Sequence, residues 1–202
     1  MKKIMVVKRD VLLADKYFQG FFPAKEFDFE DIILENYEWM QKENAEQDAG
    51  YKQPIGYCVI FNPKTKRVFL YQRSKIDANY NEKRLQGKWS CGIDGHIEKI
   101  DTANENPIHE SSLREITEEV QIYGNKTMQV LGYINDDTNN VGKVHFGILY
   151  LVLIESDEVN PLDPEISEGK LVSINYFNEI CASAEIEVEN WSKIVLAPLK
   201  NI

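Results

Sequence analysis

The central part of the chain alternates short apolar runs with turn residues. GYCVIFN (56–62) and RVFLYQRS (67–74) are runs of strand formers separated by PKTK (63–66), which predicts a β-hairpin. TMQVLGYIN (127–135) and KVHFGILYLVLIE (143–155) predict two more strands, and the second is apolar enough to lie at the centre of a sheet. LVSI (171–174) predicts a short strand. This part of the chain therefore predicts a sheet.

Helical patterns separate and follow these strands. A helix is expected from Pro107 to about Tyr123, with Asn106 as N-cap and Gly124 just beyond its end. NYFNEICAS (175–183) and the apolar spacing from Ile186 in EIEVENWSKIVLAPL (185–199) predict a helical C-terminal part. Between the first two strands and this helix, KWSCGIDGHIE (88–98) predicts a strand that ends in a loop. The order of elements predicts an α/β layered domain with a mixed sheet.

The first fifty residues have a different pattern. An apolar run (4–7) precedes the aromatic segment KYFQGFFPAKEFDF (16–29), and helical spacing extends from Ile32 to Met40 before the polar turn EQDAG (46–50). So many aromatic rings predict burial, because a disordered segment has few of them. We expect residues 1–50 to form an extension that packs on a main domain of residues 51–202, or on a second copy of the chain. The rings are either core residues or part of a ligand site.

Net charge and cysteine content limit the classes of partner and the cellular compartment that the sequence favours. The chain has 23 Lys and Arg against 33 Asp and Glu, a formal charge of −10. This balance argues against nucleic acid or an anionic membrane as a partner, but an anionic substrate can bind where metal ions intervene. Three distant cysteines without CxxC spacing, and no apolar run long enough to span a bilayer, predict a cytoplasmic protein.

Three carboxylates share one face of the expected helix 107–123. With Glu115 at 0°, Glu119 falls at about 40° and Glu118 at about −60°, because successive residues turn by about 100°. Leu113 and Ile116 lie on another face, which can pack on the sheet. We refer to Glu115, Glu118 and Glu119 as the acidic face.

A solvated acidic stripe is the usual explanation for such a face, but two costs argue against it here. Like charges one turn apart cost about 0.2–0.5 kcal/mol per pair, and the helix dipole disfavours anions in the later half of a helix. Arg114 can pair with Glu118 and leaves the other two acids uncompensated. Clustered hard oxygen ligands with too few cations favour Mg²⁺ or Mn²⁺.

REITEEVQI (114–122), together with WSCGIDGHIE (89–98) upstream, resembles the Nudix box, G-x5-E-x7-R-E-U-x-E-E-x-G-U, where U is a bulky aliphatic residue. The first glycine of the box corresponds to Gly95. The resemblance implies a Nudix-type α/β/α sandwich with a mixed β-sheet, preceded by the N-terminal extension.

The segment departs from the box at three points. Gln121 replaces the last glycine, and the spacing from Gly95 to Arg114 is five residues longer than in the box. Counting back from Arg114 places Asn106 where the box has its first glutamate. Glu105 or Asp101 takes that loop-supporting role, or the loop does without it.

The resemblance assigns roles to the matching residues. It implies that Glu115, Glu118 and Glu119 bind Mg²⁺ or Mn²⁺, that Glu115 also handles the attacking water, and that Arg114 belongs to the catalytic set. The backbone carbonyl of Asp94 would add a metal ligand.

The family often completes its site with an acid from a later loop. Glu165 and Glu168 are the candidates here, with Asp136 and Asp137 second, although a surface acid is the commoner explanation for each.

On the substrate side, Arg73, Gly95 and His96 are the candidates. Arg73 is equally well explained as a surface arginine, and His96 as a residue with a structural hydrogen bond. His145, in an apolar strand, is expected to be a hydrogen-bonded core histidine.

The expected activity is Mg²⁺- or Mn²⁺-dependent hydrolysis of a diphosphate linkage in a nucleoside diphosphate derivative or a related phosphate-containing small molecule. Two alternatives are a Nudix-fold sensor of a nucleotide or sugar phosphate that does not cleave it, and an enzyme similar to isopentenyl diphosphate isomerase with Cys91 as an acid. We expect no nucleic-acid or membrane partner; a homodimer is possible, since the family often dimerises.

Overall fold

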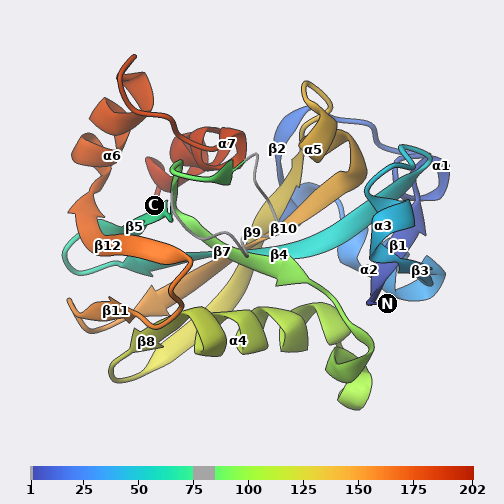
Figure 1. The fold of residues 1–202 in the computed structure, drawn as a ribbon, viewed down its shortest axis with the longest axis horizontal. Coiled ribbons are helices and arrows are strands. Elements are labelled where there is room, and N and C mark those ends of the chain that lie inside the picture. The colour runs from blue at the N-terminus through green and yellow to red at the C-terminus, as the bar shows by residue number, and fades with distance from the viewer. Residues whose placement is uncertain (1, 75–84) are drawn as a thin grey trace. The chain divides into compact units, whose positions relative to one another are not determined.

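The computed structural model describes residues 2–74 and 85–202. Contacts divide the chain into two compact units, and each unit is assembled from separate stretches of sequence. Residues 2–57, 94–115 and 130–150 form unit 1; residues 58–74, 85–93, 116–129 and 151–202 form unit 2. Figure 1 follows the chain through these elements. No helix in the described ranges is long and apolar enough to cross a membrane.

Unit 1 holds the N-terminal elements and two short helices from later in the chain. These are β1 (Lys3–Lys8), α1 (Arg9–Leu12), β2 (Gly20–Pro23), η1 (Ala24–Glu26), α2 (Phe29–Asn36), β3 (Glu38–Gln41), α3 (Lys42–Ala45), η3 (Lys99–Ala103) and α5 (Asn140–Val144). Unit 2 holds β5 (Arg67–Arg73), β6 (Trp89–Ser90), β8 (Val120–Ile122), β11 (Val159–Pro161), β12 (Ile166–Ser173), α6 (Ile174–Ala182) and α7 (Asn190–Leu199). Five elements contribute residues to both units: β4 (Tyr51–Asn62), β7 (Gly92–His96), α4 (Pro107–Glu119), β9 (Lys126–Asn135) and β10 (His145–Ile154).

A large mixed sheet is the main β structure of the described residues. Its strand order is β12-β5-β4-β10-β9-β2, with β1, β3, β6 and β7 joined to it, and β11 and β8 form a separate pair. The expected hairpin is confirmed, since Phe61 pairs with Val68 and Asn62 with Arg67 in antiparallel register. β10 is buried along almost its whole length, as its apolar sequence predicts. The fold is the expected α/β arrangement with a mixed sheet.

The N-terminal aromatic residues pack within unit 1. β2 pairs with β9 in antiparallel register, with Phe22 opposite Tyr133. Phe29 is fully buried, and its ring lies 5.4 Å from Phe146 and 5.0 Å from Tyr133, measured between ring centroids. Further contacts join Phe29 to Phe18, Phe22 and Phe27. The predicted burial therefore holds fully for Phe29, while Phe18, Phe22 and Phe27 are half-buried and Tyr17 is exposed.

Two expected helices end earlier than the sequence indicates. The helix expected to reach Tyr123 stops at Glu119, because Val120–Ile122 pairs with β11 and the N–H of Leu162 donates to the carbonyl of Glu119 at 2.8 Å. The helical spacing from Ile32 to Met40 ends at Asn36 in α2, and Met40 lies in β3 opposite Ile4. In both cases pairing with a distant strand overrides a local helical pattern.

At the C-terminus, the apolar spacing from Ile186 predicts a helix that begins earlier than the observed one. α7 begins at Asn190, and the preceding residue Val188 makes a parallel bridge with Trp89. The N–H of Trp89 donates to the carbonyl of Glu187 at 2.8 Å. These backbone bonds hold residues 187–189 in an extended conformation beside β6.

Candidate functional site

Helix α4 begins with the cap that its sequence predicts. The side-chain Oδ1 of Asn106 accepts from the N–H groups of Ile108 at 3.0 Å and His109 at 3.1 Å, which satisfies two of the free donors of the first turn. Ile108 and Ile116 are almost completely buried. Because Glu115, Glu118 and Glu119 lie in the same α-helix, its periodicity places them on the acidic face.

Within unit 1, Gly95 of β7 lies directly against Glu115 of α4. A Cβ atom at Gly95 would fall 2.0 Å from Oε1 of Glu115. A side chain of any other type therefore cannot be accommodated without moving Glu115. This close approach explains why a glycine is needed where the sequence resembles the first position of the box.

Arg114 connects the insertion loop to Glu115. Its Nε donates to Oδ1 of Asp101 at 2.9 Å, its Nη2 to Oδ2 of the same carboxylate at 3.1 Å, and its Nη1 to Oε1 of Glu115 at 2.6 Å. Nη2 also contacts the carbonyl of His96 at 3.2 Å. The hydrogen bonds to Asp101 are the main cause that raises the pKa of Arg114. The guanidinium thus holds three segments of unit 1 together.

Asp101 resolves an alternative that the sequence leaves open. It lies in η3, is 4% exposed, and its Oδ2 also accepts from the N–H of Glu98 at 2.7 Å. Glu105, the other candidate for the loop-supporting acid, is exposed. Asp101 therefore occupies the loop-supporting position next to Arg114.

The remaining two glutamates of the acidic face lie in unit 2. Glu118 is exposed and Glu119 is half-buried. The carbonyl of Glu119 accepts from Leu162 and from Asp163, at 2.8 and 3.3 Å, so the segment after β11 lies at the end of α4. Gln121, which replaces the glycine of the box, pairs with Asn160 in the β8–β11 ladder. Strand backbone at this position does not require a glycine.

The two loop acids differ in their surroundings. Glu165 is half-buried, its N–H donates to Oδ1 of Asp163 at 2.6 Å, and its carbonyl accepts from Ser74 at 2.7 Å. Glu168 is exposed on β12, opposite Gln72 of β5 and next to an irregularity in the register. Glu165 thus belongs to the same short segment that contacts the end of α4.

Arg73 is buried, with 7% of its surface exposed. Its Nε donates to the carboxylate of Glu189, and its guanidinium lies 5.5 Å from the centre of the Tyr71 ring. Contact with a substrate phosphate would require Arg73 to use another of its donors, so its role in substrate binding stays a prediction.

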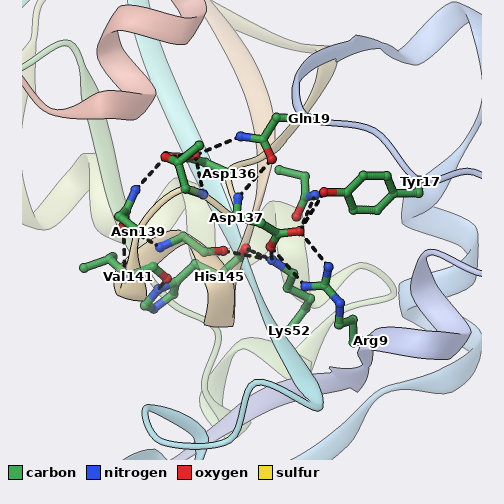
Figure 2. A network of polar contacts seen from close by, with 12 residues as sticks. Arg9, Tyr17, Gln19, Lys52, Asp136, Asp137, Asn139, Val141 and His145 are labelled. Atoms are coloured by element: carbon green, nitrogen blue, oxygen red, sulfur yellow. Dashed lines mark hydrogen bonds and ion pairs between the residues drawn. The ribbon is translucent and has the colours of Figure 1, made fainter.

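Asp137 belongs to a network of polar contacts in unit 1. Figure 2 shows the side chains of Arg9 and Lys52 directed at Asp137; Arg9 Nη1 lies 3.0 Å and Lys52 Nζ 2.9 Å from its Oδ1. The hydrogen bond from Arg9 is the main cause that holds the pKa of Asp137 far below its usual value. Lys52 is fully buried and also donates to the carbonyls of Gly142 and His145.

Asp136 lies beside this network (Figure 2). Its carboxylate accepts from the side chains of Gln19, Thr138 and Asn139 at 2.9, 2.6 and 2.7 Å. Both aspartates therefore hold the segment before β10 in place, which accounts for them without a metal.

His96 lies in a second polar cluster of unit 1. Its Nε2 lies 2.9 Å from Oε1 of Gln53 and 3.6 Å from Oε1 of Glu46. The same Glu46 oxygen lies 3.7 Å from Nε2 of His145. Burial is the main cause that lowers the pKa of His96. Burial alone would raise the pKa of Glu46, but the two nearby rings and Lys42 lower it to about 2.

His145 has the environment expected of a core histidine. It is 5% exposed, and its Nδ1 lies 2.7 Å from the carbonyl of Val141. The sequence does not predict that His145 lies close to Glu46 and His96. The three residues come from distant parts of the chain, and their spacing follows no local pattern that would reveal it.

Comparisons with known proteins agree with this architecture. Residues 51–191 match the NUDIX domain. The chain therefore belongs to the Nudix family, and it has the fold of the Nudix hydrolases. It is 36% identical to Protein YmaB of Bacillus subtilis (strain 168) over 165 residues, which is 79% of this chain and 77% of YmaB.

Solved structures show the same fold. The crystal structure of Tm1382, a candidate Nudix hydrolase, has a TM-score of 0.80 and 27% identity, and the match covers 99% of both chains. The NUDIX domain of NrtR from Shewanella oneidensis, solved with ADP ribose, has a TM-score of 0.52 and 16% identity over 75% of this chain and 89% of that domain. The likeness to Tm1382 includes the N-terminal region outside the matched domain.

Proposed function

We propose that this protein is a divalent-metal-dependent hydrolase that cleaves a diphosphate linkage in a nucleoside diphosphate derivative or a related compound. The observation that supports this most is the acidic face of α4, with Glu115 seated against Gly95. The chain thus combines the family's specific carboxylates with a glycine that leaves room for the side chain of Glu115.

The donor set fits the metal that the family implies. Three carboxylates within five residues of one helix are hard oxygen ligands, which Mg²⁺ and Mn²⁺ prefer. Glu115, Glu118 and Glu119 would hold the ion, with the carbonyl of Asp94 as a further candidate ligand. A bound Mg²⁺ neutralises charge on diphosphate oxygens and lowers the pKa of a bound water.

Neighbouring residues hold the carboxylate of Glu115 in a position from which it could bind a metal ion. Arg114 donates to Glu115 at 2.6 Å and is itself held by the buried carboxylate of Asp101. A carboxylate fixed in this way loses little side-chain freedom when a ligand binds. Arg114 therefore acts as a positioning residue, and Glu115 is the candidate to accept a proton from the attacking water.

Glu165 is the stronger candidate for the acid from the later loop. Its segment contacts the carbonyl of Glu119, whereas Glu168 is exposed on β12. On the substrate side, Gly95, His96 and Arg73 stay proposals. Gly95 is favoured by its contact with Glu115; the ring of His96 faces Glu46 and Gln53.

The substrate class follows from the family and the charge. A chain with a formal charge of −10 can hold a diphosphate where cations neutralise it. The NUDIX domain of NrtR binds ADP ribose, a nucleoside diphosphate derivative, on the same fold. Nucleic acid and membranes are not expected partners, and a homodimer and a cytoplasmic location remain predictions.

A substrate panel tests the proposal. The purified chain is incubated with ADP ribose, nucleotide sugars, dinucleotides and nucleoside triphosphates, with Mg²⁺, with Mn²⁺ and with a chelator, and the products are separated by ion exchange. We expect metal-dependent cleavage of at least one diphosphate. Binding of a panel member without cleavage would instead identify a sensor.

The isomerase alternative is disfavoured by the position of Cys91. This residue is 1% exposed, and its backbone N–H donates to the hydroxyl of Ser192 at 3.0 Å. A thiol so deeply buried is poorly placed to act on a substrate. Isopentenyl diphosphate is nevertheless included in the panel, since its conversion to an isomer without phosphate release would establish that activity.

A further inference from the structure

The described residues contain a group of three side chains with the geometry of a metal site, apart from the acidic face of α4. Glu46, His96 and His145 each offer a ligand atom, and these atoms lie within 4.8 Å of one another. Glu46 follows α3, His96 ends β7 and His145 begins β10. All three belong to unit 1.

We propose that Glu46, His96 and His145 bind a divalent transition-metal ion of the zinc class. Two imidazole nitrogens and one carboxylate are ligands that Zn²⁺ and Co²⁺ accept, whereas Mg²⁺ prefers oxygen ligands alone. The cluster is therefore expected to bind a different metal ion from the one expected at the three carboxylates of α4.

The distances suit such an ion. Zn²⁺ bonds to nitrogen and oxygen at about 2.0–2.2 Å, so tetrahedral ligand atoms lie about 3.3 Å apart. Oε1 of Glu46 lies 3.6 Å from Nε2 of His96 and 3.7 Å from Nε2 of His145. These separations exceed hydrogen-bond length. Shifts of a few tenths of an ångström would bring these two distances to the separation of ligand atoms around one ion, and all three ligand atoms already lie within 4.8 Å of one another.

The orientation of His145 provides an independent indication. Its Nδ1 donates to the carbonyl of Val141 at 2.7 Å, which leaves Nε2 as the nitrogen that faces Glu46 (Figure 2 shows the Val141 contact). Metal-binding histidines are held in this way, with the second ring nitrogen bonded to a carbonyl. In the neutral ring with its proton on Nδ1, Nε2 carries the lone pair that a metal ion requires, on the side of the ring that faces Glu46.

Gln53 provides a second indication. Its side chain is fully buried, its Oε1 lies 2.9 Å from Nε2 of His96, and its Nε2 has no hydrogen-bond partner among the described residues. Oε1 is the end of the amide that lies against the cluster, and an amide oxygen is a ligand that divalent cations accept. When His96 gives up its Nε2 proton to bind metal, Oε1 of Gln53 is the nearest candidate for a fourth ligand.

The site lies on the face of β7 opposite to the one that meets α4. Gly95 faces Glu115, and the next side chain of the strand, His96, points to the other face. The backbone carbonyl of His96 accepts from Arg114. An ion at this cluster would therefore tie the N-terminal segment to the strand that carries Gly95.

Cobalt spectroscopy on the full chain tests the proposal. The protein is treated with a chelator and titrated with Co²⁺, whose visible absorption becomes much stronger when four protein ligands replace its six water molecules. We expect one equivalent to give a saturable band that Zn²⁺ abolishes and Mg²⁺ does not. The band should be lost in Glu46→Gln, His96→Gln and His145→Gln.

Two matched variants serve as controls. His109→Gln removes the remaining histidine of the chain and Glu118→Gln weakens the acidic face, and both should keep the band. No band in the wild-type chain, or an unchanged band in the three cluster variants, would overturn the proposal, as would loss of the band in His109→Gln.

A thermal measurement covers the case in which a histidine variant fails to fold. Glu46 is half-buried, with 20% of its side chain exposed, so Glu46→Gln is the variant best suited to keep the fold. Zn²⁺ should raise the Tm of the wild-type chain and of Glu118→Gln, but not that of Glu46→Gln. An equal rise in Glu46→Gln would refute the site.

Discussion

At the scale of single residues, Asp101 holds the arginine that contacts Glu115 of the acidic face. It is 4% exposed, and it holds Arg114, which in turn contacts Glu115. A buried carboxylate with two partners is costly to replace, because each partner is left with an unmet hydrogen bond.

Replacing Asp101 with Asn should therefore lower both stability and turnover. We expect a loss of about 1–3 kcal/mol in the free energy of unfolding, and a fall in kcat that exceeds any change in KM because Glu115 is held less firmly. Urea unfolding and steady-state kinetics measure the two effects. Glu105→Gln, an exposed acid of the same loop, is the control and should resemble the wild-type chain. Equal effects in both variants would contradict the role assigned to Asp101.

The acidic face itself gives the second prediction. Glu118→Gln and Glu119→Gln keep the shape of the side chain but remove a metal-binding charge, so we expect turnover to fall by about a hundredfold or more at saturating Mg²⁺. Tm should change little or rise, because repulsion along the helix is relieved. Glu110→Gln, on the same helix but outside the acidic face, should keep its activity. Wild-type turnover in both variants would exclude the proposed hydrolase mechanism.

At the scale of elements, the segment after β11 contacts the end of α4 through the carbonyl of Glu119, and this contact is the reason to test Glu165 before Glu168. Glu165→Gln should lower kcat and leave substrate affinity nearly unchanged, because the group acts on the water or the metal during the reaction. Glu168→Gln, exposed on β12, is the comparison. If Glu168→Gln loses kcat and Glu165→Gln does not, the order of the two candidates is reversed.

The element between β9 and β10 depends on Asp137. This carboxylate pairs with Arg9 and with the fully buried Lys52. Removing one partner of a buried ion pair leaves a charge without compensation, so Asp137→Asn should lower the free energy of unfolding by about 3–5 kcal/mol at pH 7. The exposed Asp15→Asn is the control.

The pH dependence of this effect has a definite sign. The hydrogen bond from Arg9 lowers the pKa of Asp137 from 3.8. The stability that the ionised carboxylate contributes is therefore fully present above pH 3.8, and it is lost as the pH falls through the pKa of the folded state. The difference between wild type and Asp137→Asn should stay constant from pH 7 to about pH 5 and shrink at lower pH. Urea unfolding across this range measures it. A difference that grows as the pH falls would contradict the ion pair.

At the scale of the whole molecule, the N-terminal segment is part of unit 1. β1 pairs with β3 and β4, and β2 pairs with β9. Deleting residues 1–48 would expose the rings that Phe29 covers, so we expect loss of cooperative unfolding and of solubility. Phe29→Ala should cost about 3–5 kcal/mol, whereas Val11→Ala, at a position 39% exposed, should cost little. A soluble deletion variant with unchanged oligomeric state and substrate preference would show that the segment is neither structural nor selective.

The acidic face is the part of the candidate site that the sequence determined alone. Glu115, Glu118 and Glu119 lie within one helical turn and a half, so the helical period fixes their common face once the helix forms. The N-cap at Asn106 and the hairpin at residues 63–66 are equally local, because a cap or a turn depends on residues only a few positions apart. Both agree with the structure.

Tertiary structure decided everything that depends on distant pairing. The end of α4 is set by β11, the partner of Arg114 by the path of η3, and the cluster of Glu46, His96 and His145 by three separate elements. No periodicity relates residues so far apart in the sequence. Their meeting follows from strand pairing and burial across the sheet, and these nonlocal interactions outweigh local propensity wherever the two disagree.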